Sequence, residues 1–215
     1  MKSADDITDY VQESLSTGGR ILVVVAGPNG AGKSTFVDTF LRPTGLLIVN
    51  PDHIARALAP ADPTAMAYEA ARAADTVRQD LVARRVSFCM ETVFSDSKGA
   101  KVAFLKHAQE QRYVVLLAFI GLDSGELAVA RVIERVEAGG HDVPDEKILS
   151  RFPRTLDNLT HALESVDHAF LFDNSSADEP FRCVAEFGKG TVVKRGSCRP
   201  TWAVPILKAV SRKRR

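Results

Sequence analysis

A glycine-rich stretch near the start of the chain has the residue types and spacing that hold a chain of phosphates. Residues 27–35 read GPNGAGKST, which matches the pattern GxxxxGK(S/T) between an apolar run and a helix-like segment. The glycines allow backbone N–H groups to turn inward around a phosphate, and the start of the following helix favours an anion. Lys33 would place its charge between the β- and γ-phosphates, and Ser34 would offer its hydroxyl to Mg²⁺. The stretch therefore predicts a site for a nucleoside triphosphate with magnesium.

Each position of this stretch is a candidate nucleotide-binding residue. They are Gly27, Pro28, Asn29, Gly30, Ala31, Gly32, Lys33, Ser34 and Thr35. The alternative is a glycine-rich turn with an incidental lysine, and the complete motif between a strand and a helix argues against it.

Two carboxylates follow the apolar runs 46–49 and 86–90, which we expect to be strands of one sheet. Ligands of open α/β sheets bind at the carboxyl ends of the strands, so Asp52 and Glu91 should face the phosphate site. Asp52 suits the general base that a kinase needs beside the acceptor hydroxyl. The alternative is that Asp52 caps a helix beginning near His53.

Glu91 is followed by Thr92, and together these residues could hold substrate hydroxyls or a magnesium-bound water. The alternative is a partly exposed carboxylate at a strand end with no chemical role. From the residues alone, both interpretations stay open.

Four arginines lie on two consecutive helical segments. Arg131 and Arg135 are four residues apart and share one helix face, and Arg151 and Arg154 follow after two flexible glycines. Phosphoryl transfer needs positive charge that arrives with closure and excludes water, so this helical hairpin has what a closing lid requires. The alternative is that the arginines are solvated or paired with neighbouring glutamates.

The order of apolar and helix-like segments predicts the elements. Short β-branched runs alternate with longer amphipathic segments, which indicates a parallel sheet. The expected strands are 20–26, 46–49, 86–90, 113–120 and 168–172. The expected helices are 34–41, 62–85, 96–111, 125–138 and 145–166, the last interrupted near Pro153. A hairpin of 181–187 and 191–195 is expected to follow.

We therefore expect an α/β fold, a P-loop NTPase-like parallel sheet of about five strands flanked by helices, with a helical lid and a C-terminal antiparallel hairpin. The chain, 1–215, is expected to form a single P-loop kinase-like domain. Within it we expect an N-terminal helix over 1–18, the lid and its following helix over 124–165, and the hairpin with a basic tail over 180–215. The run 211–215 is expected to be a solvated terminus.

Composition excludes several classes of protein. The chain has 215 residues, of which 45% are hydrophobic and 26% charged, so it is neither disordered nor fibrous. Lys plus Arg number 28 and Asp plus Glu 27, a balance that would not steer the molecule onto nucleic acid or a membrane. No apolar run approaches the roughly 20 residues that span a bilayer, and the first residues are too polar for a signal peptide. We therefore expect a cytoplasmic protein without a membrane or nucleic-acid partner.

Taken together, several stretches resemble the zeta-toxin family of P-loop kinases, in the small form often described as a predicted ABC-type ATPase. The pieces that carry the resemblance are GPNGAGKST from Gly27, NPD from Asn50, ETVFS from Glu91, IGLDSGELAVARVIERVEAGGHDVP from Ile120, RFPRTLDNL from Arg151 and FDNS from Phe172. Their order and spacing are far more specific than the phosphate-binding motif alone.

The resemblance implies roles for the candidate residues. Asp52 would be the base, and Glu91 and Thr92 would contact the acceptor. Asn174 would lie near the nucleotide base.

The arginines also gain roles from the resemblance. Arg135 and Arg151, together with Lys33, would act on the γ-phosphate, and Arg131 and Arg154 would bind substrate beside them. The implied reaction uses ATP or GTP with Mg²⁺ to phosphorylate a small-molecule hydroxyl, with a UDP-activated amino sugar such as UDP-N-acetylglucosamine as the acceptor. The implied protein partner is an antitoxin.

Two other classes of protein also use a phosphate-binding loop. A mechanochemical ABC-type ATPase needs an LSGGQ signature and a strand ending in Asp-Glu, whereas here the run 113–122 leads into Asp123-Ser124. A signalling protein would bind nucleotide without an acceptor. Phosphoryl transfer to a small molecule separates the kinase from both alternatives.

Overall fold

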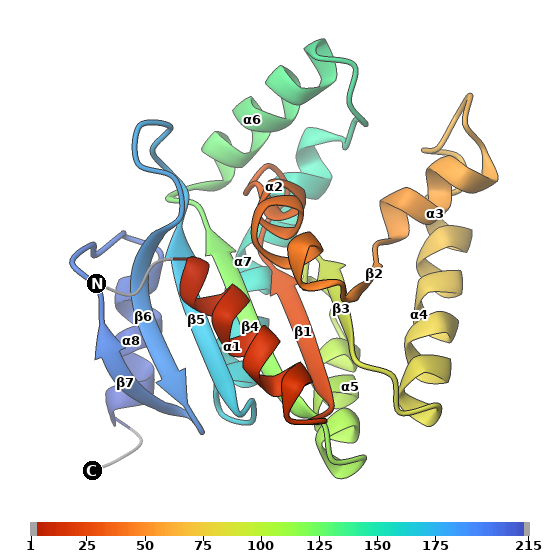
Figure 1. The fold of residues 1–215 in the computed structure, drawn as a ribbon. Helices are drawn as coiled ribbons and strands as arrows, with labels where there is room; N and C mark the ends of the chain where they lie inside the picture. Colours follow the sequence, from red (N-terminus) through yellow and green to blue (C-terminus); the bar gives the residue numbers. More distant parts are fainter. Residues whose placement is uncertain (1–3, 213–215) are drawn as a thin grey trace.

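A seven-stranded sheet with helices on both faces forms the body of the molecule (Figure 1). The computed structural model describes residues 4–212, and the end of the predicted basic run, 213–215, lies outside the described residues. The strands are β1 (Ile21–Ala26), β2 (Leu47–Val49), β3 (Phe88–Thr92), β4 (Val114–Gly121), β5 (His168–Asp173), β6 (Arg182–Gly188) and β7 (Thr191–Arg195). Their order is β2-β3-β1-β4-β5-β6-β7. The first five pair in parallel and the last two antiparallel, which confirms the predicted sheet and hairpin.

The central strand β1 determines where the site lies. All six of its residues are buried, as expected for a parallel strand covered on both faces. Its register with β3 pairs Val25 with Glu91 and Ala26 with Thr92. The phosphate-binding stretch therefore leaves β1 at the level where Glu91 and Thr92 end β3.

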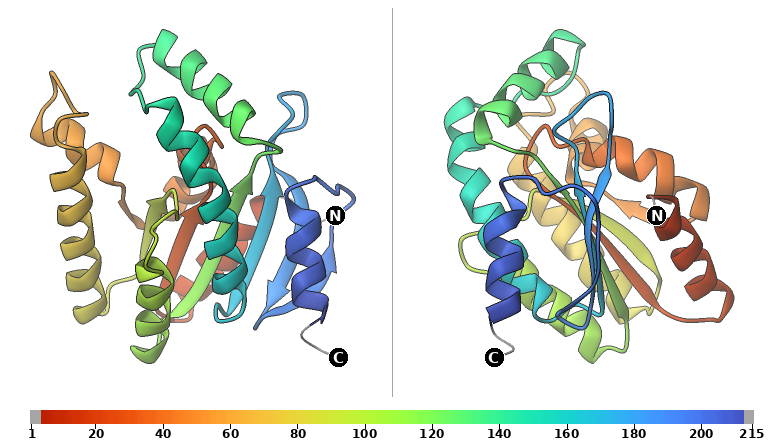
Figure 2. Two further views of the ribbon diagram at one scale, coloured as in Figure 1. Left: turned by 180° about the vertical axis from the view of Figure 1, so that it is seen from behind. Right: turned by 90° about the vertical axis from the view of Figure 1, so that its left-hand side faces the viewer.

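The helices cover both faces of the sheet. They are α1 (Asp5–Ser16), α2 (Lys33–Phe36), α3 (Pro51–Leu58), α4 (Ala67–Ala83), α5 (Ala100–Glu110), α6 (Gly125–Glu137), α7 (Asp145–Leu163) and α8 (Ala203–Arg212). Helix α2 continues into a π-helical turn (Val37–Leu41) and a 3-10 turn (Arg42–Thr44). Helices α1 and α2 contribute to the hydrophobic core on one face, and α5, α7 and α8 to the core on the other (Figure 2).

Helix α7 is continuous, so the predicted interruption near Pro153 is wrong. Proline removes one N–H and with it the hydrogen bond to the Leu149 carbonyl, on an exposed part of the helix. Buried residues on both sides of the proline, such as Ile148 and Leu159, pack into the core and hold the helix together.

Two helices were missing from the expected elements, although the alternative interpretation of Asp52 included a helix near His53. Helix α3 begins at Pro51 after Asn50, whose side chain accepts a hydrogen bond from Asp52 N (2.8 Å). An N-cap asparagine followed by proline is a helix start that the sequence could have revealed. Helix α8 contains Pro205 in its first turn, where the missing N–H is not needed. The predicted hairpin and basic tail thus include a helix.

Boundaries shift at several predicted elements. The N-terminal helix spans 5–16, and the helix expected at 62–85 begins at Ala67. The segment 34–41 is helical, but only its first residues form an α-helix.

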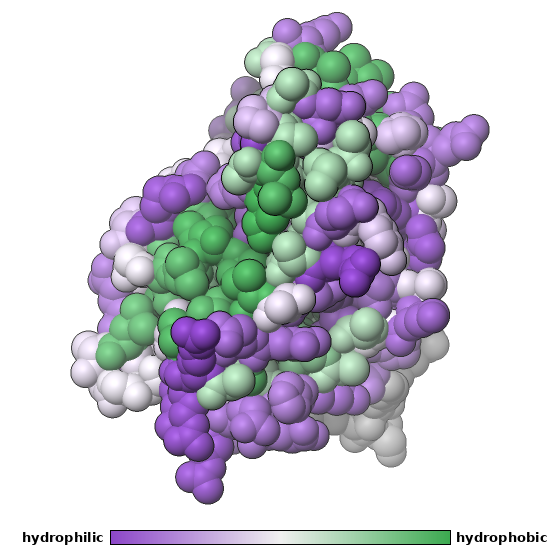
Figure 3. Space-filling view, turned by 90° about the vertical axis from the view of Figure 1, so that its right-hand side faces the viewer, coloured by the Kyte–Doolittle hydropathy of each residue, from purple (hydrophilic) through white to green (hydrophobic). Residues whose placement is uncertain are grey.

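The side of the molecule formed by α3 and α4 carries both hydrophobic and hydrophilic surface (Figure 3). Exposed apolar side chains of β2, α3 and α4 include Leu47, Leu58 and Tyr68. Within residues 4–212, no helix combines the length and the hydrophobicity that crossing a bilayer would need.

Gly121, the last residue of β4, lies against the ring of Trp202, and a Cβ there would overlap the ring. Gly188, the last residue of β6, would meet only Val193, at 3.4 Å. Overpacking costs about 1–3 kcal/mol, and each kcal/mol lowers the Tm by about 2–4 °C at this size. We expect Gly121→Ala to melt correspondingly lower and Gly188→Ala to stay near wild type in thermal unfolding. A Gly121→Ala protein that melts like wild type would contradict the packing of Trp202 on β4.

Candidate active site

A cavity of about 860 Å³ lies at the carboxyl edge of the sheet. Its walls come from the phosphate-binding stretch, the start of α3, the segment after β3, and helices α4, α6 and α7. The predicted site residues that line it are Asn29, Gly30, Gly32, Lys33, Ser34, Thr35, Asp52, Glu91, Thr92, Arg131, Arg135, Arg151 and Arg154. Four others, Gly27, Pro28, Ala31 and Asn174, are not part of its lining. The structure thus brings together in one cavity residues that are more than 100 positions apart in the chain.

The phosphate-binding loop is packed so tightly that two of its glycines cannot be replaced freely. Gly32 has φ +83°, and a Cβ there would stand 2.7 Å from Asn174 Nδ2. Gly30 has φ +71°, and a Cβ there would stand 2.8 Å from the Ala128 carbonyl of α6. Both glycines combine a left-handed backbone with a close neighbour. Asn174 and α6 therefore pack directly on this loop.

Lys33 begins α2 and is 8% exposed. Its Nζ donates a hydrogen bond to the Pro28 carbonyl (2.8 Å). Burial lowers the pKa of Lys33, while the nearby carboxylates Glu91 and Asp52 act to raise it. The ammonium group is thus held by its own loop, in the position where a phosphate oxygen would be a stronger, charged partner.

Glu91 is a buried carboxylate with two partners. Ser34 Oγ donates to Glu91 Oε1 (2.9 Å), and Asn50 Nδ2 donates to Oε2 (2.7 Å). Burial raises the pKa of Glu91, although the charge of Lys33 and the hydrogen bond from Ser34 act to lower it. The strand-end carboxylate is therefore not a partly exposed group, because only 7% of it is accessible.

Asp52 lies at the second position of α3 and is exposed at the cavity. The helix cap is Asn50, so the alternative interpretation of Asp52 as the cap is wrong. Its carboxylate therefore remains available to a ligand in the cavity.

The segment 92–96, which comprises the last residue of β3 and the four that follow, is held in an unusual conformation. Phe94 is buried and has φ +64°, and its N–H donates to Thr92 Oγ1 (3.1 Å). Thr155 and Asn158 of α7, both buried, donate side-chain hydrogen bonds to carbonyls of this segment (2.9–3.0 Å). A non-glycine residue in this conformation costs free energy that the surrounding contacts must offset. Helix α7 thus fixes one wall of the cavity.

All four predicted arginines reach the cavity from the hairpin of α6 and α7. Arg131 Nη2 donates to the Ser175 carbonyl (3.1 Å), and Arg135 Nη2 to the His141 carbonyl (2.5 Å). Arg154 Nε donates to the carbonyl one turn earlier in α7 (3.1 Å). Within the described residues, Arg135 Nε is buried without a hydrogen-bond partner. The arginines therefore have N–H groups left for an anionic ligand.

Four further charged residues that were not predicted as site residues line the cavity: Arg78, Asp96, Lys101 and Glu134. Arg78 of α4 is 2% exposed, pairs with Asp75, and has a buried Nη1 without a partner among the described residues. Lys101 Nζ lies 2.7 Å from the same Asp75 carboxylate, and Asp96 ends the segment after β3. Only Arg78 left a signal in the sequence, because it falls on the buried stripe of α4 that includes Ala74.

A parallel sheet with GxxxxGKST after its central strand, and a helical hairpin bearing arginines beside that loop, defines a P-loop fold of the kinase-like kind. The family model of the Zeta toxin matches residues 5–178. The chain therefore belongs to the Zeta toxin family.

The chain is similar in sequence to one known protein and similar in fold to several solved structures. An uncharacterized protein of Haemophilus influenzae (strain ATCC 51907 / DSM 11121 / KW20 / Rd) is 28% identical over 130 residues, which is 60% of this chain and 91% of that protein. A chain of the PezAT chromosomal toxin-antitoxin system of Streptococcus pneumoniae superposes with a TM-score of 0.59 at 12% identity, covering 97% of this chain and 95% of that one.

The AvrRxo1-ORF1:AvrRxo1-ORF2 complex also has this fold. Its structure with sulphate ions gives a TM-score of 0.61, and its structure with ATP gives 0.59, both at 16% identity. They cover 97% and 96% of this chain and 71% of theirs. At these identities the likeness establishes the fold.

Burial of Glu91 leads to a prediction about stability. Its pKa is raised above the ordinary 4.5, so the folded state loses relative stability as pH rises from 4.5 through the raised value. In Glu91→Gln, one amide oxygen can accept from Asn50 and the amide N–H can donate to Ser34. We expect Glu91→Gln to melt about 2–4 °C above wild type near neutral pH, with the difference vanishing at about pH 4.

The matched control is Glu137→Gln, at an exposed site on α6, which should leave the melting temperature unchanged at both pH values. A Glu91→Gln protein that melts below wild type near neutral pH would contradict the cost assigned to the buried carboxylate.

Proposed function

We propose that this chain is a kinase that transfers the γ-phosphate of ATP or GTP to a hydroxyl of a small molecule. The observation that carries the proposal is the shared cavity of Lys33, Asp52, Glu91 and four arginines. A phosphate-binding lysine, a carboxylate available as a base and several cations around the transferred group are the parts that phosphoryl transfer requires.

The nucleotide would bind over the loop 27–35. Its β- and γ-phosphates would take the place of the Pro28 carbonyl on Lys33. Asn29, Gly30 and Gly32 of the loop line the cavity at this position.

The donor set beside the loop fits Mg²⁺. The hydroxyl of Ser34 and the carboxylates of Glu91 and Asp52 line the cavity, and Mg²⁺ prefers such hard oxygen ligands. In kinases the ion takes most of its other ligands from phosphates and water, and it neutralises charge on the transferred group. Ser34 would be the direct ligand, and Glu91 would orient it through their hydrogen bond.

The acceptor would lie between Asp52 and the part of the cavity lined by Arg78 and Lys101. Asp52 would accept the proton of the attacking hydroxyl, and Thr92 would border the same space. Arg78 and Lys101 share the single carboxylate of Asp75, and with the four arginines and Lys33 they make the cations of the lining more numerous than its carboxylates, Asp52, Glu91, Asp96 and Glu134. A nucleotide sugar with its diphosphate, such as UDP-N-acetylglucosamine, has the negative charge that this lining would attract.

The arginines would act at different stages. Arg135 and Arg151 would contact the γ-phosphate in the transition state, while Arg131 and Arg154 would bind the substrates. The Asn174 side chain donates a hydrogen bond to the Ala31 carbonyl of the phosphate loop. Its contact with the nucleotide base remains a prediction.

We propose a cytoplasmic enzyme with an antitoxin partner, supported by the fold it shares with a chain of a toxin-antitoxin system. The ABC-type ATPase is the weaker alternative, because Asp123 accepts hydrogen bonds from Thr201 (3.0 and 3.2 Å) and is not part of the cavity lining.

The general base is tested by Asp52→Asn. The variant keeps the shape of the side chain and the Asn50 cap but cannot accept a proton, so we expect acceptor phosphorylation to fall roughly 10²- to 10⁴-fold. Nucleotide affinity and thermal melting should stay near wild type. In Lys33→Ala, by contrast, we expect both nucleotide binding and transfer to be lost, because the charge in the phosphate site is removed. Near-normal phosphorylation by Asp52→Asn would assign the base elsewhere, with Glu91 as the next candidate.

The lid arginines are tested by separating turnover from binding. Arg135→Ala and Arg151→Ala should lower kcat by about 10-fold or more and change nucleotide affinity much less, because their contacts form in the transition state. Arg84→Ala is the matched control, since Arg84 pairs with Asp80 at the surface and is outside the cavity lining. Loss of nucleotide affinity with an unchanged kcat would mean that the lid arginines act only as ground-state anchors.

A further inference from the structure

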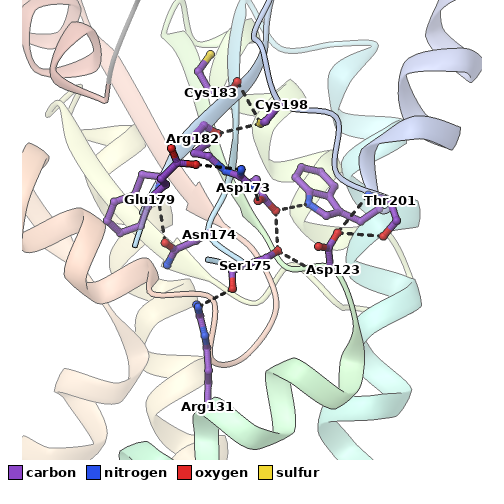
Figure 4. A network of polar contacts seen from close by, with 12 residues as sticks. Asp123, Arg131, Asp173, Asn174, Ser175, Glu179, Arg182, Cys183, Cys198 and Thr201 are labelled. Carbon is purple, nitrogen blue, oxygen red and sulfur yellow. Dashed lines mark hydrogen bonds and ion pairs between the residues drawn. The ribbon is translucent and has the colours of Figure 1, made fainter. Parts of the chain in front are cut away.

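Three successive residues, the last of β5 and the two that follow it, each contact a different part of the molecule, and Figure 4 shows the contacts of Asp173 and Ser175. Asp173 binds β6 and the segment before α8, Asn174 binds the phosphate loop, and Ser175 binds α6. Residues 173–175 therefore connect the C-terminal elements to two walls of the cavity.

Asp173 is a buried carboxylate with three hydrogen-bond donors. One oxygen accepts from Ser175 Oγ (2.7 Å) and Trp202 Nε1 (3.0 Å), and the other accepts from Arg182 Nη2 (2.8 Å). Burial acts to raise the pKa of Asp173, but the hydrogen bonds outweigh it and hold the pKa below its ordinary value. The side chain is thus charged and fixed in one orientation.

Ser175 links Asp173 to Arg131, an arginine that lines the cavity. Its hydroxyl donates to Asp173 and accepts from Asp123 N (3.0 Å), which fixes the peptide that follows β5. Its carbonyl accepts from Arg131 Nη2 (3.1 Å). Within residues 4–212, this is the only hydrogen bond to the Arg131 guanidinium.

Arg131 is close enough to the phosphate loop for its orientation to matter. A Cβ at Gly30 would stand 3.2 Å from Arg131 Cβ, and Arg131 lines the cavity. Arginine is long and flexible, and a guanidinium that is fixed before binding loses less freedom when it contacts a ligand.

Apart from Ser175, the side chains that hold Asp173 and Asp123 lie beyond the family match, which ends at residue 178. Arg182 is on β6, and Thr201 and Trp202 directly precede α8. The C-terminal elements therefore do more than cover the sheet.

We propose that Asp173 is a positioning residue of the nucleotide site: through Ser175 it holds Arg131 in the orientation that contacts bound nucleotide, and Arg182 and Trp202 fix Asp173. This inference rests on the proposed function in taking Arg131 as a nucleotide contact. It adds that the hairpin and α8 are required for a correctly built site.

The first test uses Ser175, whose side chain is small enough to remove without opening a large cavity. Ser175→Ala should lower kcat/KM for ATP roughly 10- to 100-fold with little change in melting temperature, because the peptide holding Arg131 is released. Ser175→Thr keeps the hydroxyl and should restore the activity. The matched control is Ser165→Ala, which removes a hydroxyl bound to the Ala162 carbonyl at the end of α7.

The second test asks whether the effect passes through Arg131. Trp202→Phe keeps a ring but loses the N–H donor to Asp173, and Asp173→Asn keeps the shape but loses the charge. Each is combined with Ser175→Ala and with Arg131→Ala in a double-mutant cycle. In the Arg131→Ala background, these substitutions should change kcat/KM less than twofold, although any loss of melting temperature should remain.

The outcomes separate this inference from the proposed function. If the wild-type protein binds ATP but phosphorylates no acceptor, the proposed function fails, and the same cycle is read from ATP affinity by calorimetry. If these substitutions lower kcat/KM by the same factor in the Arg131→Ala background as in the wild-type background, the inference is overturned. Wild-type kinetics and affinity in Ser175→Ala would overturn it as well.

Discussion

The parallel pairing of β1 with β3 sets the geometry on which the rest of the site depends. This register puts Glu91 beside Val25, close to the start of the phosphate loop, so that Ser34 and Asn50 can share one buried carboxylate. Burial lowers the pKa of Lys33 and raises that of Glu91, so the fold holds both groups where their charged forms are less favourable than in water. Folding is thus less favourable than it would be without these buried charged groups, which are held in place before any ligand binds. Such a cost to stability is a common property of functional sites.

Three walls of the cavity are held by side-chain hydrogen bonds from neighbouring elements. Helix α7 fixes the segment 92–96 through Thr155 and Asn158, and the residues after β5 fix the phosphate loop and α6. Those residues are in turn fixed by β6 and by the segment before α8. The sheet supplies the positions of the reactive groups, and these side-chain hydrogen bonds set their orientations.

Local patterns were enough to predict the strands, the phosphate loop and the helices α6 and α7, because each is encoded in consecutive residues. The start of α3 was readable from Asn50 and Pro51 but was overlooked. Arg78 left one signal, its place on the buried stripe of α4, but its role as a wall of the cavity was not readable. The contacts of Asp173 were not readable either, since they depend on how elements distant in sequence pack together. Pro153 misled the prediction for the opposite reason: tertiary packing on both sides of it overrides a local helix-breaking signal.

Transfer of the γ-phosphate to a small molecule is tested most directly by incubating the protein with Mg²⁺, γ-labelled ATP and a pool of metabolites that includes nucleotide sugars, then separating the labelled products. We expect the label to appear on a small molecule that carries a hydroxyl, and the labelled compound identifies the acceptor. Label that is released only as inorganic phosphate, at the same rate with and without the metabolite pool, would contradict the kinase and favour the ATPase.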